Sequence, residues 1–251
     1  MSDFIYLASQ SPRRKQLLEQ WGVRCELLLP DASEDAESLE EVLKGEAPAA
    51  YVQRVTGLKL QASLARLKRR DLPPAPVLCA DTTVALGRRI LGKPADAAEA
   101  KHMLASLAGQ RHRVLTAVAV GKPGKGDRSW SALSASWVTF EPLSAAQIRR
   151  YVDSGEPMGK AGAYAIQGQA GLWVRRIHGS HTGIQIRGAK QAITAHFHWL
   201  GHLQCTAFAA IGRLCKPCHT RTAHPLRRPC MAHRALAGYV LQPVRYGAEE
   251  T

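Results

Sequence analysis

The sequence lacks the marks of several protein classes. No apolar run reaches the roughly 18 residues of a membrane-spanning helix. The opening residues, "MSDFIYLAS", lack a basic stretch followed by a long apolar segment, so we expect no signal peptide and a cytoplasmic location. We find no internal repeat and no low-complexity tract. With 45% apolar residues in a chain of 251, we expect a globular protein with a substantial core.

Acidic residues are scarce in one part of the chain. Residues 181–251 hold nine Lys or Arg but two acids, whereas residues 1–180 hold 25 and 18. The same tail has seven of the ten histidines and four of the six cysteines. We therefore expect a folded domain over residues 1–184 and an atypical basic tail over 185–251. The net charge of +14 suggests an anionic partner, such as nucleic acid, a nucleotide or a membrane surface, but half of that charge lies in the tail.

Strand-like and helix-like segments alternate over residues 1–184. This alternation, with hairpins, predicts an α/β fold with a mixed twisted sheet and flanking helices. Ser11, Asp96 and Ser144 are expected N-caps, and Gly87 is expected to turn a hairpin. The segment 38–70 has helical spacing, and we expect Pro48 and Gly57 to interrupt it. The expected strands are 4–9, 25–30, 75–86, 88–94, 112–121 and 131–143, and the other expected helices are 12–22, 97–109 and 145–155.

The first candidate site is the strand-to-helix junction from Ser9 to Arg14. A helix N-terminus has free N–H groups and a partial positive charge, and the guanidinium groups of Arg13 and Arg14 suit phosphate. Two cations at this position oppose the helix dipole, which a sequence selected for stability alone would avoid. A simple cap with solvated arginines explains the same residues, so both interpretations stay open.

Other candidates are one acid and several lysines. Asp81, in "LCADTTV", interrupts a strand that otherwise has the pattern of a buried one, so it needs a cation, a metal or hydrogen bonds. A strand-end Asp bonded to its threonine neighbours is the alternative. Lys59, Lys93 and Lys160 stand beside turn residues and could each be surface lysines. Together with two arginines and an acid, they are also the components of a phosphoryl site.

Five segments, in order and at compatible spacing, resemble the Maf family of nucleoside triphosphate pyrophosphatases. They lie within residues 4–184 and read "LASQSPRRKQLL", "ADTTV", "LGKP", "LAGQRHRVLTAV" and "YVDSGEPMGKAGAYAIQG". The resemblance implies two lobes around a cleft, similar to inosine-triphosphate pyrophosphatases. It also implies hydrolysis of a nucleoside triphosphate to the monophosphate and pyrophosphate with a divalent metal, Mg²⁺ or Mn²⁺.

The resemblance also implies roles for individual residues. Asp81 matches the general base that activates the attacking water, and it also matches a metal ligand. Glu34 matches a second acid that helps to hold the metal. The positions that select the base are matched by Arg13, Thr82 and Gln167, a combination that resembles the branch acting on dTTP and UTP. The positions on the phosphate side are matched by Arg14, Lys59, Lys93 and Lys160, and Ser9 is a further expected substrate-binding residue.

Beyond "IHGSHTGI" the resemblance stops. Three interpretations of the tail compete: a frameshifted ending, a zinc site formed by Cys215, Cys218, Cys230 and His233, and a haem attachment at "CKPCH". For the whole chain, a pyrophosphatase is the leading hypothesis. A basic protein that binds nucleic acid or other anions and a catalytically impaired Maf remnant are the alternatives. We expect a nucleoside triphosphate as partner, no membrane and no nucleic acid, and we leave a homodimer open.

Overall fold

The computed structural model describes residues 4–31, 34–35, 38–124, 128–179 and 242–243. In chain order the elements are β1 (Ile5–Leu7), α1 (Pro12–Gln20), β2 (Cys25–Leu27), the 3-10 turn η1 (Ser38–Glu40), α2 (Pro48–Arg69), β3 (Val77–Leu86), β4 (Arg89–Leu91), α3 (Ala97–Leu107), β5 (Arg111–Lys122), β6 (Arg128–Phe140), α4 (Ala145–Asp153), η2 (Ala161–Ala163), η3 (Gln169–Trp173), β7 (Val174–His178) and β8 (Gln242–Pro243).

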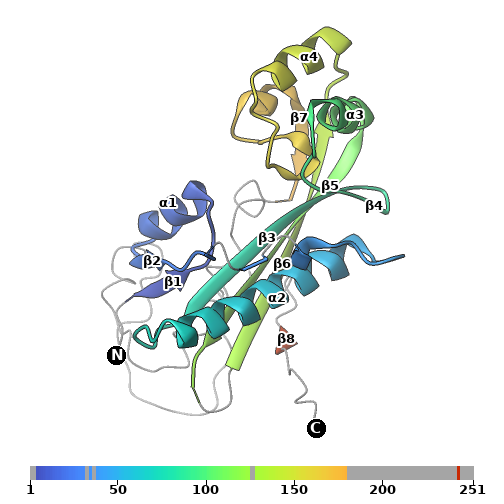
Figure 1. Cartoon of the computed structure of the whole chain (residues 1–251). Helices are drawn as coiled ribbons and strands as arrows, with labels where there is room; N and C mark the ends of the chain where they lie inside the picture. Colours follow the sequence, from blue (N-terminus) through green and yellow to red (C-terminus); the bar gives the residue numbers. More distant parts are fainter. Residues whose placement is uncertain (1–3, 32–33, 36–37, 125–127, 180–241, 244–251) are drawn as a thin grey trace, which may run out of the picture.

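The strands form one mixed sheet in the order β2-β1-β3-β5-β6-β7, with β4 paired to β3 and β8 paired to β6. β1 is parallel to β2 and β3, and the remaining pairs are antiparallel. The long strands β3, β5 and β6 form the centre of the sheet (Figure 1). The predicted mixed α/β fold is therefore confirmed.

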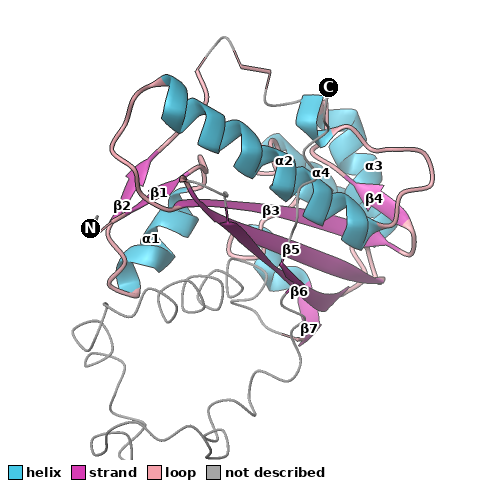
Figure 2. Cartoon of the chain, turned by 90° about the horizontal axis from the view of Figure 1, so that it is seen from below, coloured by secondary structure: helices cyan, strands magenta, loops and turns pink. Residues whose placement is uncertain are grey.

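Alternating side chains on these strands supply two apolar faces. On one face, α2 buries Val52, Val55 and Leu60 against small and branched residues of β3 and β5. On the other face, Leu18 of α1 packs with Leu7, Leu78, Val118 and their neighbours. Seen from below, α2 and α1 lie on opposite sides of the strands (Figure 2). The period of two along β3 and β5 places these two layers.

A second lobe gathers at the other end of the long strands (Figure 1). Here α3, α4, η2, η3 and β7 share a core that includes Leu104, Phe140, Tyr151 and Tyr164. The rings of Phe140 and Tyr164 pack edge to face, with their centroids 4.9 Å apart. Because β3, β5 and β6 pass through both lobes, the sheet fixes how far apart the lobes lie.

The helix expected over 38–70 is shorter than the pattern predicted. It begins at Pro48, where the predicted interruption falls, and continues through Gly57 to Arg69, so Gly57 does not interrupt it. Proline suits the first helical turn because its missing N–H has no partner there anyway. An interior glycine costs a helix only about 1 kcal/mol, which the burial of Val52 and Val55 offsets. The part of the segment before Pro48 is a loop that contains the 3-10 turn η1.

Most of the expected turns and caps are confirmed. Asp96 accepts a hydrogen bond from the Glu99 backbone, and Ser144 forms a capping box with Gln147. Gly87 joins β3 to β4 with a positive φ of 60°. Ser11 stands at the N-cap of α1 without a side-chain cap bond.

The predictions for the tail, including Cys215, Cys218, Cys230, His233 and "CKPCH", lie outside the described residues. The boundary at residue 184 stays a prediction. Among the helices that the structure describes, none is both long and apolar enough to cross a bilayer.

Candidate active site

The candidate site lies at a gap in one edge of the sheet. β5 covers one edge of β3 along its length. On the other edge, β1 pairs with β3 as far as Leu78, and β4 pairs from Val84 onward. Between these points, residues 79–83 have no strand partner on that edge among the described residues. A backbone carbonyl there needs another donor, and Nη1 of Arg14 supplies it to the oxygen of Ala80 at 2.6 Å.

Asp81 and Thr82 lie in this open stretch. Consecutive side chains of a strand leave on opposite faces, so Asp81 points toward α2 and Thr82 toward α1. Since the edge between them is open, groups on the two faces are close enough to interact. Arg14, on the α1 face, is affected by acids on the α2 face. Burial lowers the pKa of Arg14, and the charges of Asp81 and Glu40 partly offset that lowering.

On the α2 side, four charged groups form a chain of alternating sign. Lys59 Nζ donates to Asp81 Oδ1 and to Glu40 Oε1, each at 2.8 Å. Lys93 Nζ donates to the same Glu40 carboxylate at 2.8–2.9 Å. The hydroxyl of Tyr51 holds the carbonyl of Glu40 at 2.9 Å and so fixes η1 against α2. One ammonium group thus serves two carboxylates, and one carboxylate serves two ammonium groups.

The pKa values of Lys59 and Glu40 are shifted by the charged groups beside them. Burial alone would lower the pKa of Lys59, but the adjacent charge of Asp81 and the hydrogen bonds to Asp81 and Glu40 raise it overall. Burial alone would raise the pKa of Glu40, but the hydrogen bonds from Lys59 and Lys93 lower it overall. Both groups are therefore held in their charged forms near neutral pH.

On the α1 side, the site consists of one arginine and neutral groups. Arg14 Nη1 donates to Ser9 Oγ at 2.9 Å, and Nη2 donates to Thr82 Oγ1 at 3.3 Å. Thr82 Oγ1 also lies 3.1 Å from Thr116 Oγ1 on β5. The pairing of β3 with β5 places these threonines opposite each other. The first turn of α1 contains no acid, so its basic charge is not neutralised locally.

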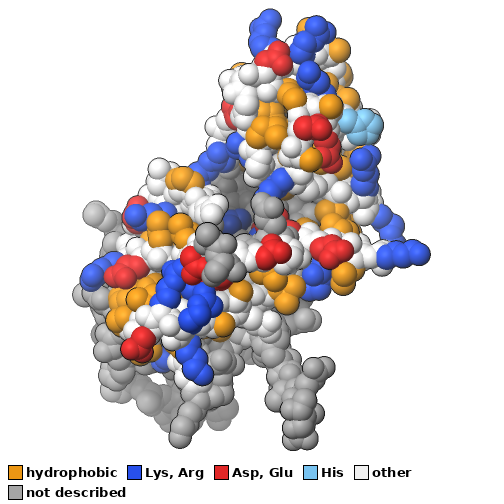
Figure 3. Space-filling model, viewed as in Figure 1, with side chains coloured by type: hydrophobic (Ala, Val, Ile, Leu, Met, Phe, Trp, Pro, Cys, Tyr) orange, Lys and Arg blue, Asp and Glu red, His pale blue; other side chains and the backbone are white. Residues whose placement is uncertain are grey.

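A contact between Arg13 and Gln167 joins the two lobes. The guanidinium of Arg13, at the start of α1, donates to the side-chain oxygen of Gln167, which follows η2 in the second lobe. The two residues are 154 positions apart in the chain. The surface is hollowed between the two lobes, with acidic and basic side chains at its margins (Figure 3). The contact itself brings a side chain of α1 against a side chain of the second lobe.

Two of the predicted site residues lie in other contacts. Lys160 Nζ donates to the backbone carbonyl of Glu156 and, at 3.5 Å, to that of Met158. Glu34 accepts from Arg66 Nε at 2.8 Å and from Arg69 Nη2 at 2.7 Å. These hydrogen bonds, from Arg66 above all, lower the pKa of Glu34 to about 2.

The structure thus brings together six predicted residues and pairs two more. The six are Ser9, Arg14, Lys59, Asp81, Thr82 and Lys93, and the pair is Arg13 with Gln167. Their functional roles, like those of Glu34 and Lys160, stay predictions. Sequence reasoning missed Glu40, because residues 31–46 contain seven acids and no spacing signal distinguishes this one.

Comparisons with known proteins identify the family. Residues 4–185 match the family described as "Maf-like protein". The chain is 64% identical to the dTTP/UTP pyrophosphatase of Albidiferax ferrireducens over 184 residues, which are 73% of this chain and 90% of that protein. It is 63% identical to the protein of the same name from a Polaromonas species, over 73% of this chain and 89% of the relative. For Burkholderia pseudomallei the identity is 60%, over 72% and 86%.

A solved structure is similar at a lower level. It is the nucleoside-triphosphatase, or dITP/XTP pyrophosphatase, of Mycobacterium abscessus, at 18% identity and a TM-score of 0.31, covering 53% of this chain and 72% of that one. The family match spans the strands and helices of both lobes and every predicted site residue. The chain belongs to the Maf family.

Proposed function

We propose that this chain hydrolyses dTTP and UTP to the nucleoside monophosphate and pyrophosphate. The observation that carries the proposal is the carboxylate of Asp81, which lies at an open sheet edge between the cationic groups of Lys59 and Arg14. A base beside cations is what hydrolysis of a phosphoanhydride needs, since the base activates water and the cations neutralise the phosphates. The names of relatives at 60–64% identity supply the substrates dTTP and UTP.

In the proposed reaction, Asp81 is the general base. Lys59 donates to its Oδ1, which leaves Oδ2 as the proton acceptor for a water molecule. As that water forms its bond to phosphorus, Asp81 takes the proton. The bond between the α phosphate and the bridging oxygen breaks, and pyrophosphate leaves with the bond's electron pair. Lys59, Lys93 and Arg14 stabilise the charge on the phosphate oxygens.

The α1 side, together with Gln167 of the second lobe, would read the nucleoside. Gln167 offers a donor and an acceptor in one amide, which suits the edge of a pyrimidine. Arg13, which holds that amide in the structure, can exchange this contact for the substrate. Thr82, fixed by Arg14 and Thr116, adds a hydroxyl at the same place.

The donor set fits a divalent metal that is bound together with the substrate. Mg²⁺ is usually held by one or two carboxylates, substrate phosphates and water. Asp81 and Glu40 supply two carboxylates that share the ammonium of Lys59. The described residues contain no group of three or more His, Cys, Asp or Glu that could hold a metal without the substrate. When bound, Mg²⁺ or Mn²⁺ would neutralise phosphate charge. Glu34 would have to give up Arg66 and Arg69 to join it.

The test is product analysis of the full chain with a panel of eight nucleoside triphosphates. We expect dTTP and UTP to give monophosphate and pyrophosphate in equal amounts, with Mg²⁺ or Mn²⁺ present and not with EDTA. Release of inorganic phosphate with a diphosphate product would contradict the proposed bond cleavage. Nucleotide binding without turnover would identify a catalytically impaired remnant.

A further inference from the structure

The turn that presents Gln167 is short and tightly closed. The amide of Gly168 donates to the carbonyl of Ala165 at 3.0 Å, so Gln167 occupies a corner position of the turn. Its side chain is exposed, whereas Ala165 and Ile166 before it are buried. The direction of the Gln167 amide therefore depends on how the backbone on either side of it is held.

Glu156 holds the backbone that follows Gln167. Its Oε1 and Oε2 accept from the amide of Gln169 at 3.2 and 3.4 Å. The same carboxylate lies directly against Gly168, where an added Cβ would stand 1.7 Å from Oε1. Hydrogen bonds to a charged acceptor are about twice as strong as those between neutral groups. The carboxylate thus fixes two consecutive residues after Gln167.

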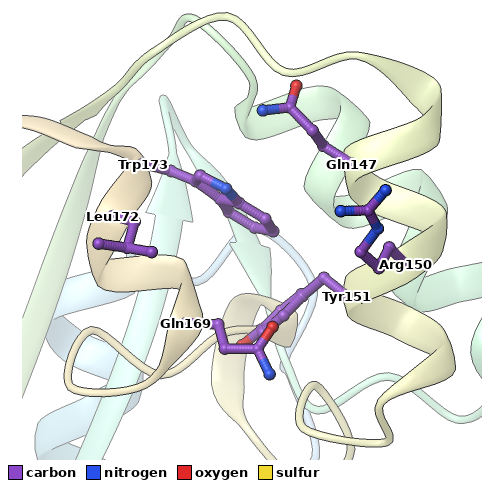
Figure 4. A pocket seen from close by; sticks show the side chains of 6 residues that line it. All are labelled: Gln147, Arg150, Tyr151, Gln169, Leu172 and Trp173. Atoms are coloured by element: carbon purple, nitrogen blue, oxygen red, sulfur yellow. The ribbon is translucent and has the colours of Figure 1, made fainter.

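Tyr151 holds the backbone that precedes Gln167. Its hydroxyl accepts from the amide of Ala165 at 3.3 Å and donates to Glu156 Oε1 at 3.0 Å. Its ring is 1% exposed and meets Trp173 edge to face, with centroids 4.8 Å apart. Figure 4 shows the two rings and Gln169 lining one pocket beside α4. One hydrogen-bonded pair therefore spans the turn from Ala165 to Gln169.

We propose that Tyr151 and Glu156 are positioning residues that fix the turn carrying Gln167 and thereby set the selection among nucleoside bases. This inference rests on the proposed function, because it gives Gln167 the task of reading the base. Neither residue contacts the group that reacts. Their effect reaches the substrate through the backbone of residues 165–169.

The variants Glu156→Gln and Tyr151→Phe test the proposal in the full chain. Each keeps the packing and weakens or removes hydrogen bonds of the pair. We expect the ratio of kcat/KM for dTTP to that for dATP to fall about tenfold, the effect of losing one hydrogen bond to a charged group. Glu141→Gln, an exposed acid in the same lobe, is the matched control and should leave the ratio unchanged.

A double-mutant cycle separates positioning from general damage. In a Gln167→Ala background, Glu156→Gln should change the ratio no further, because the side chain that it positions is gone. A further drop of the same size, or a fall in kcat with an unchanged ratio, would overturn the proposal.

Amide hydrogen exchange keeps the inference testable if the wild type hydrolyses no nucleotide, in which case the proposed function has failed by itself. The amides of Ala165, Gly168 and Gln169 should exchange faster in Glu156→Gln and Tyr151→Phe than in the wild type. Unchanged exchange at these three amides would show that the pair does not hold the turn.

Discussion

The two sides of the open edge of β3 are built differently. Toward α2, Asp81 lies in a chain of four charged groups at 2.8–2.9 Å spacing. Toward α1, Thr82 lies among hydroxyls, one carbonyl and a half-buried arginine, Arg14. Charged chains suit the handling of phosphates and protons, whereas neutral donors and acceptors suit discrimination between bases. Under the proposed function, two adjacent residues of one strand would have different tasks, Asp81 in the chemistry and Thr82 in recognition.

The largest expected effect on activity is on the α2 side, which we call the charged side; the α1 side, where Thr82 lies, we call the neutral side. Asp81→Asn keeps the shape but removes the base, so we expect kcat to fall by about a thousandfold, the scale of general-base catalysis. The binding of dTTP, measured by calorimetry in EDTA, should change little. Thr82→Val is the matched variant on the neutral side and should retain most of kcat. Equal losses in the two variants would break the comparison.

The lysines of the charged side should differ in importance. Lys59 contacts both Asp81 and Glu40, whereas Lys93 contacts Glu40. Lys59→Met should raise KM about ten- to hundredfold and also lower kcat, because it removes a charged partner of the base. Lys93→Met should raise KM alone. Steady-state kinetics with dTTP at saturating Mg²⁺ measure kcat and KM for both variants. A lowered kcat in Lys93→Met would contradict the proposal that Lys93 acts on phosphate binding alone.

On the neutral side we expect changes in selectivity with little loss of rate. Gln167→Ala should lower the preference for dTTP over dATP about tenfold, since one amide no longer pairs with the pyrimidine. Competition assays with both nucleotides in one mixture measure this ratio directly. Gln169→Ala, two residues further along the same segment, serves as the control. A loss of kcat without a change in this preference would contradict a role for Gln167 in base selection and would indicate a role in the chemical step.

The smallest expected effect concerns Glu34, which belongs to neither side as the structure places it. Its pKa is about 2, against 4.5 for an unperturbed group. A lowered pKa stabilises the folded state above the unfolded-state value and loses that contribution as pH falls toward the folded-state value. Thermal melting from pH 6 to pH 2 should therefore show a steeper loss of stability in the wild type than in Glu34→Gln. Parallel curves would contradict the ion pair with Arg66.

Much of the fold could be predicted from local pattern. The strand around Asp81, the caps at Asp96 and Ser144, and the hairpin at Gly87 all depend on neighbours within a few residues. The helix expected before Pro48 was wrong, because those residues have helical spacing, yet Tyr51 binds the backbone of Glu40 as part of a loop.

The candidate site could be predicted only in part. Its residue types follow from the motifs, but the partners of Asp81 and Gln167 come from segments 22 and 154 residues away. Glu40 and Glu156 carry no local signal, because an acid in a loop has many equivalent solvated positions. Only the packing of η1 on α2, and of the 165–169 turn on α4, selects them.

Arg14 has a consequence for the behaviour of the protein in solution. An unpaired strand edge is a template on which another chain can add a strand. The guanidinium of Arg14 occupies the carbonyl of Ala80 at that edge and places a permanent positive charge there. An incoming strand would have to displace a half-buried cation from its three oxygen partners, Ser9 Oγ, Ala80 O and Thr82 Oγ1. We therefore expect Arg14 to hinder edge-to-edge pairing between neighbouring molecules, so that a concentrated sample of an Arg14→Ala variant aggregates sooner than the wild type.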